Sequence, residues 1–346
     1  MSINWFTWLA RPKRGNGGGS PTEKNLASDA LDLRYPSSSQ NDRDRASAVF
    51  SGAVVIYRAL PAMLELVECI RDITRQALKV TDPCLAESLL ESPDFRHRAS
   101  SARQVVREND DVASLYRAVL REAGVDVSAA FYDHFKLRFQ PSNEVSRTRY
   151  MRDLPVHRDT WGSNVHAQIN WWAPIWPVTT DRTIGMFPAL WDVPVLNTSA
   201  DWSYPEFIRQ LKADKNTAYP MLPYCVDSLS PSDAVPVVIE PGDIMAFSGA
   251  HLHCSIPNQS GIVRISTETR TVSAHDLINL RSAKNVDCNA PASQFDWFRH
   301  IETGESLAQH LIATELKAPN VAGPSSQCAR AGEIESRRLG QYGEKL

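Results

Sequence analysis

The sequence predicts an α+β protein that is mainly β, arranged as a β-sandwich or jelly roll with flanking helices. From about residue 132 the hydrophobic pattern has a period of two: in HFKLRFQ (134–140), Phe135, Leu137 and Phe139 alternate with polar residues. Short segments of this kind recur with Gly and Pro between them, after a lead-in with helical periodicity. Many short strands following helices are typical of this fold class.

The lead-in contains one expected strand and two expected helices. The β-branched run in 52–60 indicates a strand. In 61–78 Pro61 suits the first helical turn and apolar residues recur at helical spacing, and a second helix is expected over 110–124, where Gly124 ends it. Further strands are expected at 166–174, 183–187, 236–243, 244–249 and 261–272, with a helical insertion at 204–214.

Composition predicts one domain between two flexible ends. Residues 1–47 and 316–346 are low in hydrophobicity, and the first of these segments is rich in Gly, Ser and charge, so we expect a leader and a tail. The domain is expected to span 48–315. Within it we expect a helical lead-in, a jelly-roll core and a C-terminal helical segment at 48–130, 131–275 and 276–315.

Bulk properties narrow the class of protein. The chain has 346 residues, 42% hydrophobic and 22% charged, and a net charge of -3, which gives no reason to expect nucleic acid or an anionic membrane as a partner. The six cysteines show no CxxC spacing, which argues against a zinc ribbon. With no long apolar run and no secretory signal pattern, we expect a cytoplasmic protein acting on a small molecule; oligomeric state is left open.

A candidate metal site begins in DLPVHRDTWGSNVHAQINWW (153–172). On an extended segment the side chains of His157 and Asp159 point the same way, so both can face one ion. The other such pair, His300 and Glu302, lies in a segment expected to be helical and is excluded. His251 and His253 follow downstream. Two histidines and one carboxylate form the facial triad of non-haem Fe(II) oxygenases.

On these residues the chain resembles the Fe(II)/2-oxoglutarate dioxygenases, within them the phytanoyl-CoA dioxygenase-like branch, over roughly residues 50–275. His157-Arg158-Asp159 matches the family's His-x-Asp motif. PGDIMAFSGAHLHCSIPNQSGIVR (241–264) matches its second motif, in which Asn and Arg follow the distal histidine by five and eleven residues. These spacings favour His253 over His251 as the ligand. One departure is GMFPALW (185–191), where many members carry Pro-Gly-Ser-His.

The resemblance implies a double-stranded β-helix of cupin-like type and a set of cofactors. His157, Asp159 and His253 would hold Fe(II), while Arg264, helped by Ser255, would hold 2-oxoglutarate, and O2 is the oxidant. Because the acidic position is Asp rather than the Gly or Ala of halogenating relatives, hydroxylation or desaturation is favoured. From the residues alone, Arg264 could instead pair with Glu268 on a surface strand.

Other candidates follow from strand parity and proximity. Gln168, Asn170 and Trp172 share one face and are expected to reach the metal chamber and contact the cofactor; a solvated outer face is the alternative. Substrate contacts are expected from Trp161, Arg270, His251 and Arg138, although Trp161 could equally be core and an arginine is often only a solvated charge.

The predicted function is hydroxylation or desaturation of a small molecule, with release of succinate and CO2, in secondary or amino-acid-derived metabolism. The tryptophans and arginines expected near the site suggest a substrate with an apolar body and an acidic group. Alternatives are a cupin-like isomerase, a zinc hydrolase, or a jelly-roll binding module without turnover.

Overall fold

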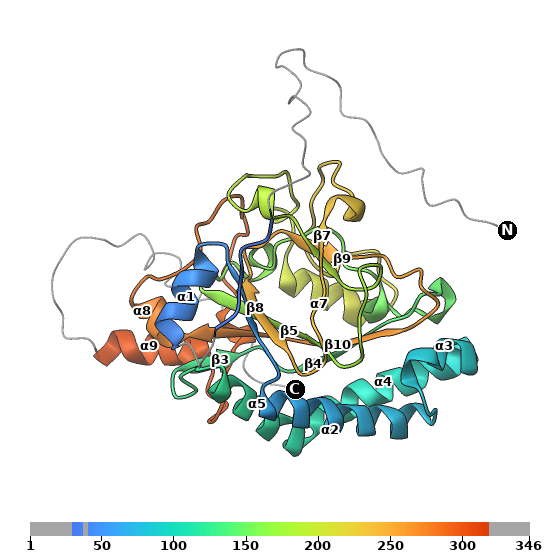
Figure 1. Ribbon diagram of the computed structural model, residues 1–346. Coiled ribbons are helices and arrows are strands. Elements are labelled where there is room, and N and C mark those ends of the chain that lie inside the picture. Colours follow the sequence, from blue (N-terminus) through green and yellow to red (C-terminus); the bar gives the residue numbers. More distant parts are fainter. Residues whose placement is uncertain (1–29, 37–40, 318–346) are drawn as a thin grey trace, which may run out of the picture.

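The computed structural model describes residues 30–36 and 41–317 and consists of two β-sheets with helices packed against the larger one (Figure 1). The α+β class expected from the sequence is confirmed. Most of the expected leader and nearly all of the expected tail lie outside the described residues. Among those described, the helices are α1 (Asp42–Phe50), α2 (Pro61–Leu78), α3 (Ala86–Leu89), α4 (Ser92–Glu108), α5 (Asp110–Glu122), α6 (Thr160–Ser163), α7 (Tyr204–Ala213), α8 (Ala274–Ile278) and α9 (Leu307–Lys317).

In the described part of the chain, the larger sheet has eight strands in the order β1-β2-β8-β5-β10-β3-β11, with β4 also paired to β10. All neighbours are antiparallel except β1 and β2. Its strands are β1 (Leu33–Arg34), β2 (Val54–Tyr57), β3 (Ala130–Tyr132), β4 (Lys136–Gln140), β5 (Gln168–Pro174), β8 (Ile244–Ser248), β10 (Arg264–Ser273) and β11 (Arg299–His300).

The smaller sheet packs on the face of the larger one that points away from α2, α4 and α5. Its described strands are β6 (Ile184–Met186), β7 (Val235–Val237) and β9 (His253–Ser255), in the order β7-β6-β9. Gly185 in β6 has no room for a side chain, because a Cβ there would lie 2.6 Å from the Ala234 Cβ and 2.7 Å from Ile256 Cδ1. This close approach lets β6 sit between β7 and β9.

The two faces of the large sheet bury different side chains. Trp171 and Ile265 point into a core shared with α2, α4 and α5, which Figure 1 shows lying together along one side of the sheet. Trp172 and Phe247 point the other way, into a second core with Met186 of the small sheet. Residues of β5, β8 and β10 therefore alternate between a helix-covered face and the space between the sheets.

Three segments differ from the expected secondary structure. Helix α1 begins at Asp42, inside the range expected as leader, and Arg45 and Val49 on it are buried against the domain. His300 lies on strand β11, not on a helix, and its Nε2 contacts the Ser128 carbonyl at 2.9 Å, away from the metal-site candidates. The expected strand over 236–243 extends only to Val237.

Two further corrections concern the helical segments. Helix α4 was not expected, because three of its four buried positions, Ala99, Ala102 and Val106, are small side chains that give a weak hydrophobic signal. The C-terminal segment expected to be helical is only partly so: α8 and α9 are separated by loops and by β11. Within residues 30–36 and 41–317, no helix combines the length and apolarity that a bilayer-spanning segment requires.

Candidate metal centre

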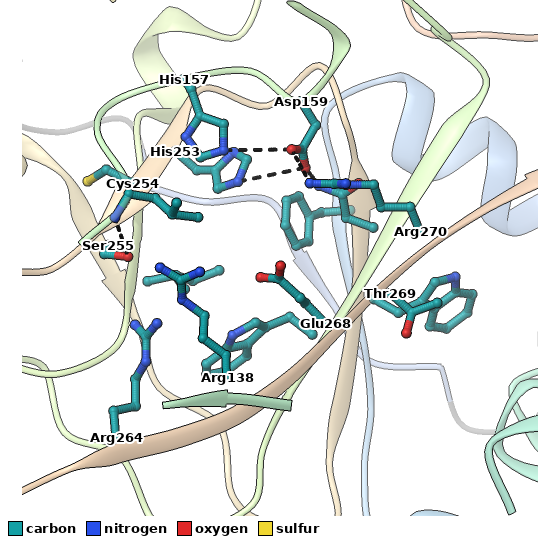
Figure 2. Close-up of a pocket in the computed structure, with 16 residues that line it drawn as sticks. Arg138, His157, Asp159, His253, Cys254, Ser255, Arg264, Glu268, Thr269 and Arg270 are labelled. Atoms are coloured by element: carbon teal, nitrogen blue, oxygen red, sulfur yellow. Dashed lines mark hydrogen bonds and ion pairs between the residues drawn. The ribbon is translucent and has the colours of Figure 1, made fainter. Parts of the chain in front are cut away.

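Three predicted ligands meet between the two sheets. His157, Asp159 and His253 each offer one ligand atom, and these atoms lie within 4.8 Å of one another. The backbones of His157 and His253 exchange two hydrogen bonds of 2.9 Å, and the two rings lie 4.2 Å apart (Figure 2). This direct pairing of two segments that are distant in sequence fixes the spacing of the imidazoles.

Both imidazoles present the same nitrogen to the centre of the site. Nδ1 of His157 donates to the Pro155 carbonyl at 2.8 Å, and Nδ1 of His253 donates to the His251 carbonyl at 2.9 Å. The Nε2 atoms are thereby left facing Asp159, at 3.6 Å for His157 and 4.0 Å for His253. A backbone acceptor on the far nitrogen fixes the tautomer in which Nε2 has a free lone pair, as metal ligation requires.

Burial and neighbouring charges together set the charge states of His253 and Asp159. Burial, together with the nearby His157, lowers the pKa of His253 to about 4, so this ring is neutral at neutral pH. Burial opposes the charge on Asp159, but the Arg270 guanidinium outweighs it and holds the pKa of that carboxyl well below its ordinary value. A neutral His253 imidazole beside the ionised Asp159 carboxylate is ready to bind a divalent cation.

Asp159 is held by a polar network on both of its oxygens. Arg270 Nη2 donates to Asp159 Oδ1 at 2.8 Å, and the Asn170 amide donates to Oδ2. Asn170 in turn accepts from Gln168 Nε2 at 2.7 Å. Arg270 is anchored at its other end by Asp133 at 3.1 Å. Arg270 was expected to contact substrate; the structure places it against the carboxylate of the metal-site candidate.

A narrow cleft of about 40 Å³ adjoins the triad. Six residues predicted to contact cofactor or substrate surround this one space: Arg138, Asn170, Trp172, Ser255, Arg264 and Arg270. Since Arg264 is only 2% exposed and forms no ion pair in the described part of the chain, β10 is not a surface strand carrying an Arg264–Glu268 pair.

Arg264 is a buried cation that forms no ion pair with any of the described residues. Its Nη1 donates to the Thr183 carbonyl at 2.8 Å, and its Nε has no hydrogen-bond partner. Burial and the neighbouring Arg138 lower the pKa of Arg264 to about 9. In Figure 2 the guanidiniums of Arg264 and Arg138 lie beside each other, across the cleft from the triad. An anionic ligand in the cleft would offset the cost of burying this charge.

A larger open chamber of about 850 Å³ continues from the cleft. Its walls come from α4, β4, the segment around Trp202 and Tyr204, and the loop at Trp297. Six residues line both spaces and therefore mark their junction: Arg138, Leu154, His157, Asp159, Glu268 and Arg270. A ligand in the chamber can thus reach the triad.

Three predicted site residues lie outside both spaces. Trp161 is fully buried in a core cluster and its indole donates to Asp287 at 2.6 Å. Gln168 stands behind Asn170. His251 is buried against Trp191, with ring centroids 4.5 Å apart, and only its backbone carbonyl serves the site, through His253. His251 and His253 share strand parity in the sequence, but β9 begins only at His253, so that parity does not apply to His251.

Several lining residues were not singled out from the sequence. Glu268 projects into the cleft and was considered only as a possible surface partner of Arg264; its phase on β10 was the available signal. Asp133, which anchors Arg270, had no signal because it lies outside any regular pattern. Chamber residues beyond the predicted set include Arg103, Lys136, Tyr150, Trp202, Tyr204 and Trp297.

Comparison with known proteins gives only distant structural likenesses. No family model and no curated protein sequence matches the chain. A nickel complex of ThoJ, described as a non-haem monooxygenase, matches with a TM-score of 0.38 at 13% identity, over 86% of this chain and 99% of that one. EvdO2 from Micromonospora carbonacea var. aurantiaca, complexed with 2-oxoglutarate, matches with a TM-score of 0.33 at 14% identity. The match covers 51% of this chain and 65% of that one.

The epimerase SnoN, in complex with Fe3+, alpha ketoglutarate and nogalamycin RO, matches with a TM-score of 0.37 at 12% identity, over 67% of this chain and 83% of that one. All three TM-scores lie below 0.5.

Proposed function

We propose that this protein is an oxygenase that uses Fe(II), 2-oxoglutarate and O2 to hydroxylate or desaturate a small molecule. We assign it to the phytanoyl-CoA dioxygenase-like branch, with the two facing sheets as its double-stranded β-helix. The observation that carries the proposal is the coexistence of the His157/Asp159/His253 cluster with the buried, anion-free Arg264 in one cleft.

The donor set fits a ferrous ion. Two imidazole Nε2 atoms and one carboxylate oxygen would hold the ion, and a set of three protein donors leaves it able to bind other ligands. The same donors also suit zinc, so the triad alone does not choose the metal. Arg264 favours the oxygenase, because a zinc hydrolase needs no buried cation beside the metal, whereas a dianionic co-substrate does.

Each residue would have a binding or orienting task. Arg264 would hold the carboxylate of 2-oxoglutarate that lies far from the metal, through two parallel hydrogen bonds. The Trp172 indole N–H, buried without a partner in the described structure, faces the same cleft and can donate to the co-substrate. Arg270 and Asn170 keep the Asp159 carboxylate in place. The apolar side chains of Ile184 and Phe247 limit water in the cleft.

When bound, Fe(II) and 2-oxoglutarate supply O2-dependent oxidation of a substrate C–H bond, coupled to decarboxylation of the co-substrate to succinate and CO2. The direct test measures succinate from 2-oxoglutarate in metal-reconstituted protein. We expect turnover that requires both O2 and Fe(II) and that Zn(II) does not support, since zinc has no redox chemistry. Hydrolytic activity with Zn(II), without succinate formation, would favour the hydrolase instead.

A further inference from the structure

Two opposite charges stand unpaired where the cleft opens into the chamber. Arg138 on β4 and Glu268 on β10 line both spaces, and in Figure 2 both side chains project into the pocket. Within the described residues, Glu268 forms no hydrogen bond and no ion pair. Arg138 Nη2 donates to the Arg152 carbonyl at 2.6 Å, while its Nε is buried without a partner. The two groups therefore do not satisfy each other.

The strand register places the two residues on the same face of the β4–β10 pair. Arg138 lies opposite Ser266 and Glu268 opposite Lys136, so Arg138 and Glu268 are diagonal neighbours across the β4–β10 pair. Such positions are roughly 7–8 Å apart, further than directly opposed residues. Arg138 is 8% exposed. Buried charges need partners, and a ligand with an acceptor for Arg138 and a donor for Glu268 would provide both.

The neighbouring charges are already matched. Lys136 pairs with Asp133, and Arg270 pairs with Asp133 and Asp159. Arg264 is assigned to the co-substrate above. Burial disfavours the charge on Glu268, but Arg138, Lys136 and Arg270 outweigh it and lower its pKa, so it is an ionised acceptor. Arg138 and Glu268 are thus the two charges at the junction that still need a ligand.

Aromatic side chains form part of the chamber wall. Trp202, Tyr204 and Trp297 line the chamber but not the metal cleft. The ring centroids of Tyr204 and Trp297 lie 4.9 Å apart, and among the described residues the buried Trp297 indole N–H has no hydrogen-bond partner. Such a surface packs flat apolar groups. The chamber therefore combines charged groups near the triad with aromatic side chains away from it.

We propose that the substrate is an α-amino or α-hydroxy acid with an aromatic or apolar body, bound by Arg138 through its carboxylate and by Glu268 through the adjacent amine or hydroxyl. This inference rests on the proposed function, because it places the substrate beside the triad. It assigns Glu268 as a specificity-determining residue and puts the carbons nearest the acid group closest to the metal.

Four probes with one phenyl body test the two contacts separately. L-phenylalanine and L-phenyllactate carry the acid with an amine or a hydroxyl, 3-phenylpropionate lacks the donor, and L-phenylalaninamide lacks the acid. Calorimetric titration into protein loaded with Ni(II) and 2-oxoglutarate measures binding without turnover. We expect phenylalanine or phenyllactate to bind at least about tenfold more tightly than 3-phenylpropionate and phenylalaninamide, because each lost charged hydrogen bond weakens binding by that order. The stronger of the first two identifies amine or hydroxyl.

Variants assign the contacts. In R138Q, phenylalanine or phenyllactate should no longer bind more tightly than phenylalaninamide. In E268Q, phenylalanine or phenyllactate should no longer bind more tightly than 3-phenylpropionate. E302Q, at an exposed glutamate of the surface pair with Arg121, is the matched control and should bind like the unaltered protein. Equal affinity for all four probes, no binding by any of them, or an E268Q variant that retains the full preference would overturn the proposal. If the unaltered, Ni(II)-loaded protein did not bind 2-oxoglutarate in the absence of any probe, that result would instead count against the proposed function.

Discussion

The Arg270 guanidinium joins two buried carboxylates, donating to Asp159 Oδ1 at 2.8 Å and to Asp133 Oδ2 at 3.1 Å. Asp133 also accepts from the Arg270 backbone N–H at 2.9 Å. Through this bridge, Arg270 on strand β10 holds the Asp159 carboxylate in place, although neither Arg270 nor Asp133 belongs to the triad.

We predict that R270K weakens metal binding about 10–100-fold, the usual cost of losing a group that orients a metal ligand. Lysine keeps the charge but lacks the planar fork that spans both carboxylates. Competition between the protein and a chelator for Co(II) measures the affinity. R121K, at an exposed ion pair with Glu302, is the control. Unchanged Co(II) affinity in R270K would show that Asp159 does not depend on this contact.

A second prediction separates the two neighbouring histidines. The His251 ring lies against Trp191, with ring centroids 4.5 Å apart, and lines neither the cleft nor the chamber, so H251F should fold and retain Co(II) binding. H253F removes an Nε2 ligand and should abolish Co(II) binding. The Co(II) absorption spectrum of each variant checks this. If H251F lost the metal while H253F kept it, the assignment of the distal ligand would be wrong.

The Asn170 amide provides a third prediction. N170A leaves Gln168 Nε2 and an Asp159 oxygen without their partner, and each unsatisfied buried group costs about 1–3 kcal/mol. We expect a lower free energy of unfolding in urea and weaker metal binding than in the unaltered protein. N216A, at an exposed position, is the matched control. A variant as stable as N216A would mean that this network contributes nothing.

Asp133 makes stability depend on pH in the acid range. Burial raises its pKa, but Lys136 and Arg270 outweigh burial, so the pKa in the folded protein lies below the ordinary value of 3.8. The unfolded chain therefore takes up this proton first, and the stabilisation, complete above about pH 4, is lost as the pH falls through the folded pKa. D133N should be less stable at pH 7 and show a shallower loss below pH 4 in urea unfolding. Parallel curves for the two proteins would contradict this.

The resemblance to the dioxygenase motifs indicated the candidate ligands, and strand parity indicated which face of the sheet several site residues occupy. Period-two patterning placed Trp172 and Trp171 on opposite faces, as β5 has them, and put Arg264 in phase with Arg270. The helix expected over 61–78 is α2. Periodicity of this kind reports which face a side chain occupies, and burial of one face makes that information strong.

Partners across the fold could not be predicted in the same way. Arg270 was expected to contact substrate because it is in phase with Arg264, and the sequence gives no sign that Asp133 and Asp159 both lie beside it. Trp161 and His251 carry residue types common in sites, yet tertiary packing puts Trp161 against Asp287 and His251 against Trp191. Parity also says nothing about whether in-phase charges such as Arg264 and Glu268 pair with each other.

The most direct test of the central claim is an anaerobic titration of 2-oxoglutarate into Fe(II)-loaded protein. The signal measured is the metal-to-ligand charge-transfer absorption band. The account predicts a band that saturates at one equivalent in the unaltered protein. In R264M, which keeps the triad, Fe(II) should still bind but saturation should require about 100-fold more 2-oxoglutarate, the cost of losing a bidentate charged contact. Absence of the band in the unaltered protein, or an R264M titration that overlays it, would contradict the account.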